Sequence, residues 1–305
     1  MDAIEIQGVT KSFGTVTAVN DLSLRVPEGA VYGFIGPNGS GKTTTLRMIV
    51  NIFYPDSGIV RVFGQEVGGD RSSQIGYLPE ERGVYRRMEV RSLLEFYGEL
   101  RGGRNVTADV NAWLDRFELS HCAKRKVETL SKGMSQKVQF IAAVVPEPKL
   151  LILDEPFTGL DPVSAEVLRA AILDLRRRGV TVILSTHDMN TAESLCDYIL
   201  MIYRGQKVLD GTLESIQEQY GNDTIRVSTA AGIESLRELP GTETIRDLGH
   251  VQEIRMARGC DPQDLLRALV ARTRVNSFSV TKPSLHDIFI RIAGHETEVE
   301  AAQHA

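Results

Sequence analysis

The chain has few cysteines, few aromatic residues and no long apolar segment. Its 305 residues include three cysteines and one tryptophan, and aromatic side chains make up 6% of the total. Cys122, Cys196 and Cys260 are far apart and follow no ligand spacing. We therefore expect reduced thiols, without a disulfide framework or a cysteine metal site. No apolar run approaches the roughly 20 residues of a membrane-spanning helix, so any action on a membrane would need a partner chain.

The charge balance also narrows the possible partners. The formal net charge is -5 at pH 7, which gives no reason to expect a nucleic acid partner. The basic clusters at residues 124–126 and 176–178 are short and typical of solvated helix faces or ends. The N-terminal segment, MDAIEIQGVTKSFG, is polar and acidic, unlike a signal peptide. The length alone predicts about two domains.

The first 220 residues predict an α/β domain. Apolar strand patterns, most of them followed by helical patterns, favour a mainly parallel sheet covered on both faces, preceded by antiparallel strands. The expected strands are residues 3–9, 21–26, 30–35, 149–153, 180–185 and 198–203, and the expected helices are 43–52 and 164–178. Between about residues 84 and 146 helical periodicity predominates, notably at 93–102, at 110–120 and after Ser131. We interpret this stretch as a helical subdomain inserted into that sheet domain.

After about Tyr220 the pattern changes. Strand patterns at 225–228, 243–247, 251–256 and 277–281 enclose helical patterns at 232–239 and 262–272. The order βαββαβ predicts a ferredoxin-like α+β module. A closing helix is expected over Pro283–Gly294, with Ser284 as its N-cap. The predicted domains are therefore residues 1–220 and 221–305.

The segment GPNGSGKT, Gly36 to Thr43, lies between a predicted strand and a predicted helix. Glycines allow backbone amides to wrap a phosphate, and the helix N-terminus adds its positive dipole. Lys42 could reach the β- and γ-phosphates, and the Thr43 hydroxyl could ligate magnesium. The alternative, a glycine-rich turn before an ordinary helix, is weakened by the preceding strand. Alone, the motif indicates P-loop nucleotide binding and nothing narrower. With the strand before it and the helix after it, it predicts that the α/β domain is a P-loop NTPase core.

Two further strand ends carry candidate catalytic groups. LLILDEP places Asp154 and Glu155 at the carboxyl end of a buried strand, where ligands bind open α/β sheets. Asp154 would hold magnesium and Glu155 would take a proton from an attacking water. His187 ends VTVILSTH, and its position favours contact with a γ-phosphate over the ordinary strand-end alternative. Asp161, in TGLDP, also fits plain turn chemistry.

A second anion site is predicted in LSKGMSQ, residues 130–136. Ser131 and Gly133 lie at a predicted helix N-terminus, which can bind an anion. A chain with one phosphate loop has no obvious need for two such helix ends. The pattern makes sense if the second end completes the nucleotide site of another subunit.

Five segments in this order resemble the ATP-binding subunits of ABC transporters: GPNGSGKT, LPEE (78–81), LSKGMSQ, LLILDEP and LSTHD (184–188). The resemblance covers about residues 3–220. It implies an ATPase that sandwiches two ATP molecules, with magnesium, in a head-to-tail homodimer or heterodimer. It also implies a permease on a separate chain, contacted near residues 82–90, and a peripheral location on the cytoplasmic face of the cell membrane.

The resemblance assigns roles to single residues of this sequence. ATP binding falls to Phe13, which would stack on adenine, and to Gly36, Pro37, Asn38, Gly39, Ser40, Gly41, Lys42, Thr43 and Thr44. The catalytic residues would be Glu155, His187 and Lys42, the magnesium ligands Thr43, Asp154 and Glu80, and the contacts to the partner's ATP Ser131, Gly133 and Asp161.

Three positions depart from the family pattern. Glu80 stands where glutamine is usual, Lys132 and Met134 alter the commonest signature, and Phe13 replaces tyrosine. Because two unit charges about 4 Å apart interact by roughly 4 kcal/mol at an effective dielectric of 20, Glu80 should bind magnesium more firmly or repel an unshielded γ-phosphate. LPEERGVY, LSKGMSQK and PSLHDIFIRIAG resemble ATPases paired with type-2 export permeases for sodium extrusion or drug export.

Alternatives remain for both domains. A non-transport ABC protein of translation, repair or signalling is disfavoured by the single ATPase domain and the acidic charge. A weakly hydrolysing regulatory subunit is disfavoured by Lys42, Glu155 and His187, although Glu80 leaves room for it. The C-terminal module would be a stabilising or dimerising appendage, or else a regulatory domain for an ion or small molecule. The sequence shows no ligand cluster in it.

Overall fold

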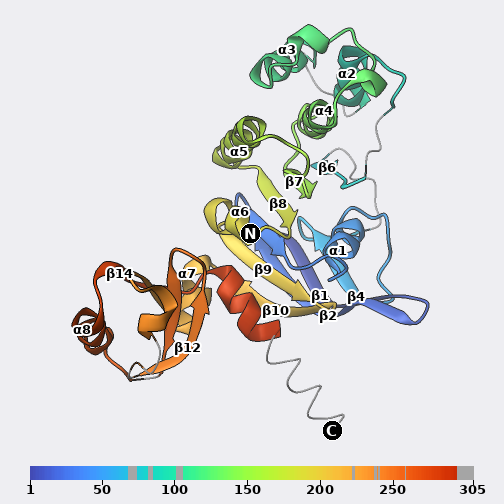
Figure 1. Cartoon of the computed structure of the whole chain (residues 1–305). Helices are drawn as coiled ribbons and strands as arrows, with labels where there is room; N and C mark the ends of the chain where they lie inside the picture. Colours follow the sequence, from blue (N-terminus) through green and yellow to red (C-terminus); the bar gives the residue numbers. More distant parts are fainter. Residues whose placement is uncertain are drawn as a thin grey trace. The chain divides into compact units, whose positions relative to one another are not determined.

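The computed structural model describes residues 1–67, 74–81, 85–100, 106–221, 224–236, 239, 241–257 and 259–293. The chain forms two compact units, Met1–Gly211 and Thr212–Ala305 (Figure 1). The boundary drawn from the sequence, after Tyr220, assigned helix α7 (Leu213–Tyr220) to the first domain. In the structure α7 belongs to the second unit, where Gln217 Nε2 donates a 2.9 Å hydrogen bond to Pro283 O.

A six-stranded sheet forms the centre of the first unit. Its order is β10-β9-β3-β8-β7-β6, and neighbours are parallel except for β10 and β9. The strands are β3 (Val31–Ile35), β6 (Ile75–Leu78), β7 (Leu150–Asp154), β8 (Thr181–Thr186), β9 (Tyr198–Tyr203) and β10 (Gln206–Gly211). Every residue of β3, β7 and β8 is buried, as expected for parallel strands covered on both faces.

The two faces of this sheet bury different layers. Because successive side chains of a strand point to opposite faces, Leu151 and Leu153 of β7 join a core with helices α4 (Lys132–Val144) and α5 (Pro162–Arg177). Leu150 and Ile152 join a second core with α1 (Lys42–Ile49) and an antiparallel sheet. That sheet has the order β2-β1-β4-β5 and consists of β1 (Asp2–Phe13), β2 (Val16–Pro27), β4 (Ser57–Val62) and β5 (Gln65–Glu66). The predicted fold class is confirmed.

Helices inserted between β6 and β7 gather at one end of the first unit (Figure 1). They are α2 (Val90–Leu100), α3 (Val106–Arg116), the short η2 (Ser120–Cys122) and η3 (Val127–Thr129), and α4. The rings of Trp113, Phe117 and Phe140 lie 5.5–6.1 Å apart between centroids and join α3 to α4. A later helix, α6 (Met189–Leu195), follows β8. Among the described residues, no helix has the length and apolar character needed to cross a bilayer.

The second unit has the topology of a ferredoxin-like module. Its sheet has the order β12-β13-β11-β14, with antiparallel pairs throughout. Its elements are β11 (Thr224–Thr229), η4 (Gly232–Leu236), β12 (Thr242–Asp247), β13 (Gln252–Met256), α8 (Pro262–Arg272), β14 (Val275–Thr281) and a helix at 285–293. The helix predicted at 232–239 is the short 3₁₀ helix η4, and residues 237–238 lie outside the described residues.

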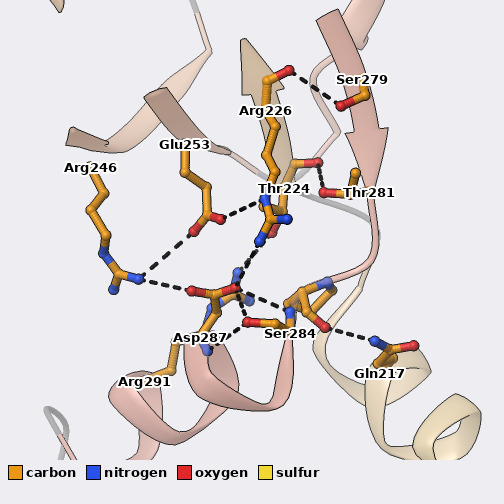
Figure 2. A network of polar contacts seen from close by, with 11 residues as sticks. Gln217, Thr224, Arg226, Arg246, Glu253, Ser279, Thr281, Ser284, Asp287 and Arg291 are labelled. Carbon is orange, nitrogen blue, oxygen red and sulfur yellow. Dashed lines mark hydrogen bonds and ion pairs between the residues drawn. The ribbon is translucent and has the colours of Figure 1, made fainter. Parts of the chain in front are cut away.

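The two faces of this second sheet differ in polarity. On one, Ile225 and Ile254 pack with Leu265 and Leu269 of α8. On the other, Arg226 and Arg246 each pair with both Glu253 of the sheet and Asp287 of the last helix (Figure 2).

Ser284 caps that last helix. Its Oγ accepts a hydrogen bond from Asp287 N at 3.2 Å, and Ser284 N donates to Asp287 Oδ2 at 3.1 Å. This is a reciprocal capping box, and it confirms the predicted N-cap.

Candidate active site

The loop between β3 and α1 contains two glycines, Gly36 and Gly41, that no other residue could replace without displacing backbone. Gly36 and Gly41 have φ angles of +146° and +109°. A Cβ on Gly36 would lie 2.1 Å from Ile202 O, and one on Gly41 would lie 2.4 Å from Ala18 O. The loop therefore follows neighbouring backbone closely and ends with the free N–H groups of the first turn of α1.

Lys42 extends into this loop. Its side chain is buried, and Nζ donates to Gly36 O at 2.7 Å and to Pro37 O at 2.9 Å. Burial lowers the pKa of Lys42, and the carboxylates of Glu155 and Asp154 oppose that shift. An ammonium group in this setting has lost much of its hydration and would gain from a nearby anion.

The loop opens on a cavity of about 420 Å³. Its lining residues are Ala18, Asn38, Gly39, Gly41, Lys42, Thr43, Thr44, Glu80 and Glu155. The structure thus brings most of the predicted phosphate-loop residues and two predicted carboxylates, Glu80 and Glu155, to one cavity. A cavity with amides, an ammonium group and carboxylates suits a phosphate chain accompanied by a cation.

Asp154, the last residue of β7, is fully buried. Its Oδ1 accepts hydrogen bonds from Thr43 Oγ1 at 3.3 Å and from Ser185 Oγ. Its Oδ2 is buried and has no hydrogen-bond partner within the described part of the chain. Such an oxygen is costly to bury unless something else satisfies it. A carboxylate beside a hydroxyl offers the hard oxygen ligands that Mg²⁺ prefers, so these residues fit a magnesium ion.

Glu155 follows β7 in an unusual backbone conformation, with φ at +49°. Its N–H donates to Ser185 O at 3.2 Å and to Ser185 Oγ at 3.1 Å. Its side chain is only 10% exposed, and Oε1 lies 2.9 Å from Nδ1 of the half-exposed His187. Left-handed non-glycine residues concentrate at functional sites. The structure therefore pairs the predicted base with the predicted histidine beside the phosphate loop.

The other predicted residues lie outside this cavity. Ser131 caps α4 by accepting a hydrogen bond from Met134 N at 3.3 Å, and Gly133 lies in the first turn of that helix. Asp161 caps α5 by accepting from Ser164 N at 2.9 Å, and its bonds from Ser164 lower its pKa. The N-terminus of α4 matches the predicted helix end, whereas α5 begins at Pro162, two residues before the predicted start at 164. None of Ser131, Gly133 and Asp161 lines the cavity beside the phosphate loop of the same chain.

Phe13 ends β1 and is 46% exposed. Its ring packs edge-to-face against Phe53 at 5.3 Å, and Lys11 Nζ lies 5.6 Å from its centroid. The Phe13 ring is therefore partly exposed, and a planar ligand could stack on it.

The sequence patterns did not predict a role for Ser185, which contacts both Asp154 and Glu155. Its hydroxyl bonds to Asp154 Oδ1 and to the backbone N–H of Glu155. The available signal was a hydroxyl residue at the end of a fully apolar strand run, two positions before His187. Nothing in the sequence showed which neighbouring strand it would face.

Comparisons with known proteins agree with this geometry. Residues 19–158 match the ABC transporter family model, and residues 211–293 match the model "ATP-binding protein DrrA1-3-like, C-terminal domain". The chain is 38% identical over 293 residues to the uncharacterized ABC transporter ATP-binding protein YhaQ of Bacillus subtilis. The aligned region covers 95% of this chain and 98% of that protein.

Two other similarities point the same way. The daunorubicin/doxorubicin resistance ATP-binding protein DrrA of Streptomyces peucetius is 33% identical, over 99% of this chain and 96% of its own length. A solved structure titled "Structure of ATP binding subunit of ABC transporter" superposes with a TM-score of 0.69 at 28% identity, covering 72% of this chain and 93% of that one. The chain therefore belongs to the ATP-binding subunits of ABC transporters, ATPases that work with separate membrane permease components.

Proposed function

We propose that this chain powers an ABC exporter by hydrolysing magnesium-bound ATP in a head-to-tail dimer. The observation that carries the proposal is one cavity lined by Lys42, Thr43 and Glu155, with Asp154 bonded to Thr43 and His187 paired with Glu155. Asp154 Oδ2 has no hydrogen-bond partner among the described residues. These residues are needed by different parts of the reaction, and they come from three separate segments of the chain. Relatives named for daunorubicin/doxorubicin resistance and for Nod factor export support the export direction.

The roles follow from chemistry and position. Lys42 and the loop amides would bind the phosphates, while Thr43, Asp154 and Glu80 would hold magnesium, which offsets phosphate charge when bound. Glu155 would accept the proton of the attacking water. His187, held by Glu155 at 2.9 Å, would contact the γ-phosphate from the exposed side.

The dimer accounts for the residues outside the cavity. Ser131, Gly133 and Asp161 sit at or beside two helix N-termini, each of which can contribute an anion contact. In a head-to-tail dimer they would meet the ATP held by the other chain. Phe13 would stack on adenine of its own chain's ATP.

We propose that the permease docks on the helical subdomain. Tyr85 and Leu100 are 60% and 67% exposed, and Tyr85 packs edge-to-face with the exposed Phe96 at 5.9 Å. Exposed apolar groups gathered in this way mark interaction surfaces. Of the contact predicted at residues 82–90, residues 82–84 lie outside the described residues. Docking there would hold the chain at the cytoplasmic face of the cell membrane.

Magnesium-dependent ATPase activity, measured against protein concentration, tests the proposal. We expect the rate to rise faster than linearly as dimers form, and Glu155→Gln to reduce it by at least about 100-fold while ATP still binds. A rate strictly proportional to concentration would count against the dimer. ATP binding without turnover at any concentration would favour a regulatory subunit, the second candidate that Glu80 in the cavity supports.

A further inference from the structure

The N-terminal part of α4 packs against the segment that begins at Glu155. Gln136 is buried, and its Nε2 donates a 3.2 Å hydrogen bond to Pro156 O. Pro156 is the residue directly after Glu155. The side chain of Gln136 therefore joins the helix that carries Ser131 and Gly133 to the backbone that carries Glu155, the proposed base, in the same chain.

A second contact reinforces the first. A Cβ built on Gly159 would lie 2.8 Å from Lys132 Cε, so the stem of Lys132 lies across that glycine. The backbone of the two segments is also close, because a Cβ on Gly133 would lie 3.3 Å from Gly159 O. Lys132 is one of the positions that depart from the commonest signature, and a glycine there would have no side chain to make this contact.

Glu155 depends on such contacts for its position. Its left-handed backbone, at φ +49°, persists only where the surroundings hold it. Ser185 holds its N–H from one side. On the other side, Gln136 holds the carbonyl of the next residue.

We infer that Gln136 is a positioning residue for Glu155 and that it couples the two ATP sites of the dimer. The inference rests on the proposed function, because the coupling needs a second chain. When Ser131 and Gly133 meet the other chain's ATP, α4 is fixed, and Gln136 fixes the Glu155 segment with it. Glu155 of each chain is then aligned only when α4 of the same chain contacts the ATP held by the other chain.

The chain offers a matched control one turn along the same helix. Gln139 is also buried, and neither its Nε2 nor its Oε1 has a hydrogen-bond partner among the described residues. Replacing either glutamine by methionine keeps the length and flexibility of the side chain. Gln136→Met removes a hydrogen bond to Pro156, whereas Gln139→Met removes an amide that makes none.

The experiment measures steady-state hydrolysis by the full chain against magnesium–ATP concentration, together with ATP affinity and melting temperature. For Gln136→Met we expect kcat to fall about tenfold, KM to change less than about twofold, and the Hill coefficient to fall towards one. For Gln139→Met we expect kcat, KM and the Hill coefficient to match the wild type and the melting temperature to rise, since an unpaired buried amide is removed.

The possible results distinguish a failure of the Gln136 role from a failure of the proposed dimeric ATPase. A wild-type chain that does not hydrolyse ATP, or does so without cooperativity, would overturn the proposed dimeric ATPase. A cooperative wild type with Gln136→Met indistinguishable from it, or with equal losses in both variants, would overturn the role of Gln136 alone. If Gln136→Met does not fold, Gln136→Leu also removes the donor without adding a buried charge, and the same fall in kcat is required of it.

Discussion

Two buried aspartates, one in each unit, have opposite surroundings. Asp154 is fully buried in the first unit, with Lys42 in the same site and one oxygen without a partner among the described residues. Asp287 is 6% exposed in the second unit and accepts from Arg246 Nη1 at 2.8 Å and from Ser284. Among the described residues, one oxygen of Asp154 lacks a hydrogen-bond partner, whereas both oxygens of Asp287 have one.

This difference indicates that Asp154 serves ligand binding and that Asp287 serves the stability of its unit. A buried carboxylate without its full set of partners costs free energy, and a site retains it where a ligand supplies the missing charge. Burial by itself raises the pKa of Asp287, but the hydrogen bonds from Ser284 and the charge of Arg246 outweigh it, so the pKa lies below its ordinary value. A group stabilised in this way holds a helix on a sheet. The described network therefore favours the interpretation of the second unit as a stabilising module.

The sharpest test of the comparison is Asp154→Asn. We expect magnesium-dependent hydrolysis to fall by about 100- to 1,000-fold, because the carboxylate that fits the cation is gone. Without nucleotide, the melting temperature should stay level or rise, since asparagine removes a buried negative charge of which one oxygen has no hydrogen-bond partner among the described residues. Its amide oxygen can still accept from Thr43 and Ser185. Thermal shifts with and without magnesium–ATP check both points. A large loss of stability in the nucleotide-free variant would show that Asp154 stabilises the fold, as Asp287 does.

Asp287→Asn should give the opposite pattern. We expect the second unit to lose about 1–2 kcal/mol of stability, less than a fully buried pair would cost because Arg226 and Arg246 are 44% and 41% exposed. ATP hydrolysis should stay within about twofold of the wild type. Denaturant unfolding measures the loss, as the change in the free energy of unfolding for the transition that belongs to the second unit. If Asp287→Asn loses ATP hydrolysis but keeps its stability, Asp287 has a functional role and not a structural one.

The pH dependence of stability sharpens the same contrast. Since the pKa of Asp287 in the folded chain lies below the ordinary value of 3.8, its contribution is present at neutral pH and is lost as pH falls through the folded pKa. The stability difference between wild type and Asp287→Asn should therefore be full at pH 7 and shrink below about pH 4. Acid titrations of both proteins, followed by circular dichroism, test this. A difference that grows on acidification would contradict it.

The sequence predicted the elements of both units better than the contacts between them. Apolar runs located β3, β7 and β8, and motif order located Lys42, Asp154 and Glu155 on one sheet edge. Spacing could not show that Ser185 would hold both acids, because that contact depends on which strands are neighbours. Nor could it show that Gln136 bonds to Pro156 whereas Gln139, with the same chemistry, has no partner. Such distinctions arise from packing, which local patterns do not encode.

The smallest expected effect concerns Glu80, an exposed carboxylate on the cavity wall. If the first unit's site is completed by a cation, Glu80 adds negative charge that favours it. Because charges near solvent interact by about 0.5–1 kcal/mol, Glu80→Gln should raise the magnesium concentration for half-maximal hydrolysis about two- to fivefold, with little change at saturating magnesium. Titrating magnesium at fixed ATP measures the shift, with Glu81→Gln as the neighbouring control. A lower magnesium requirement in Glu80→Gln would show instead that the carboxylate repels phosphate, and would remove Glu80 from the metal site.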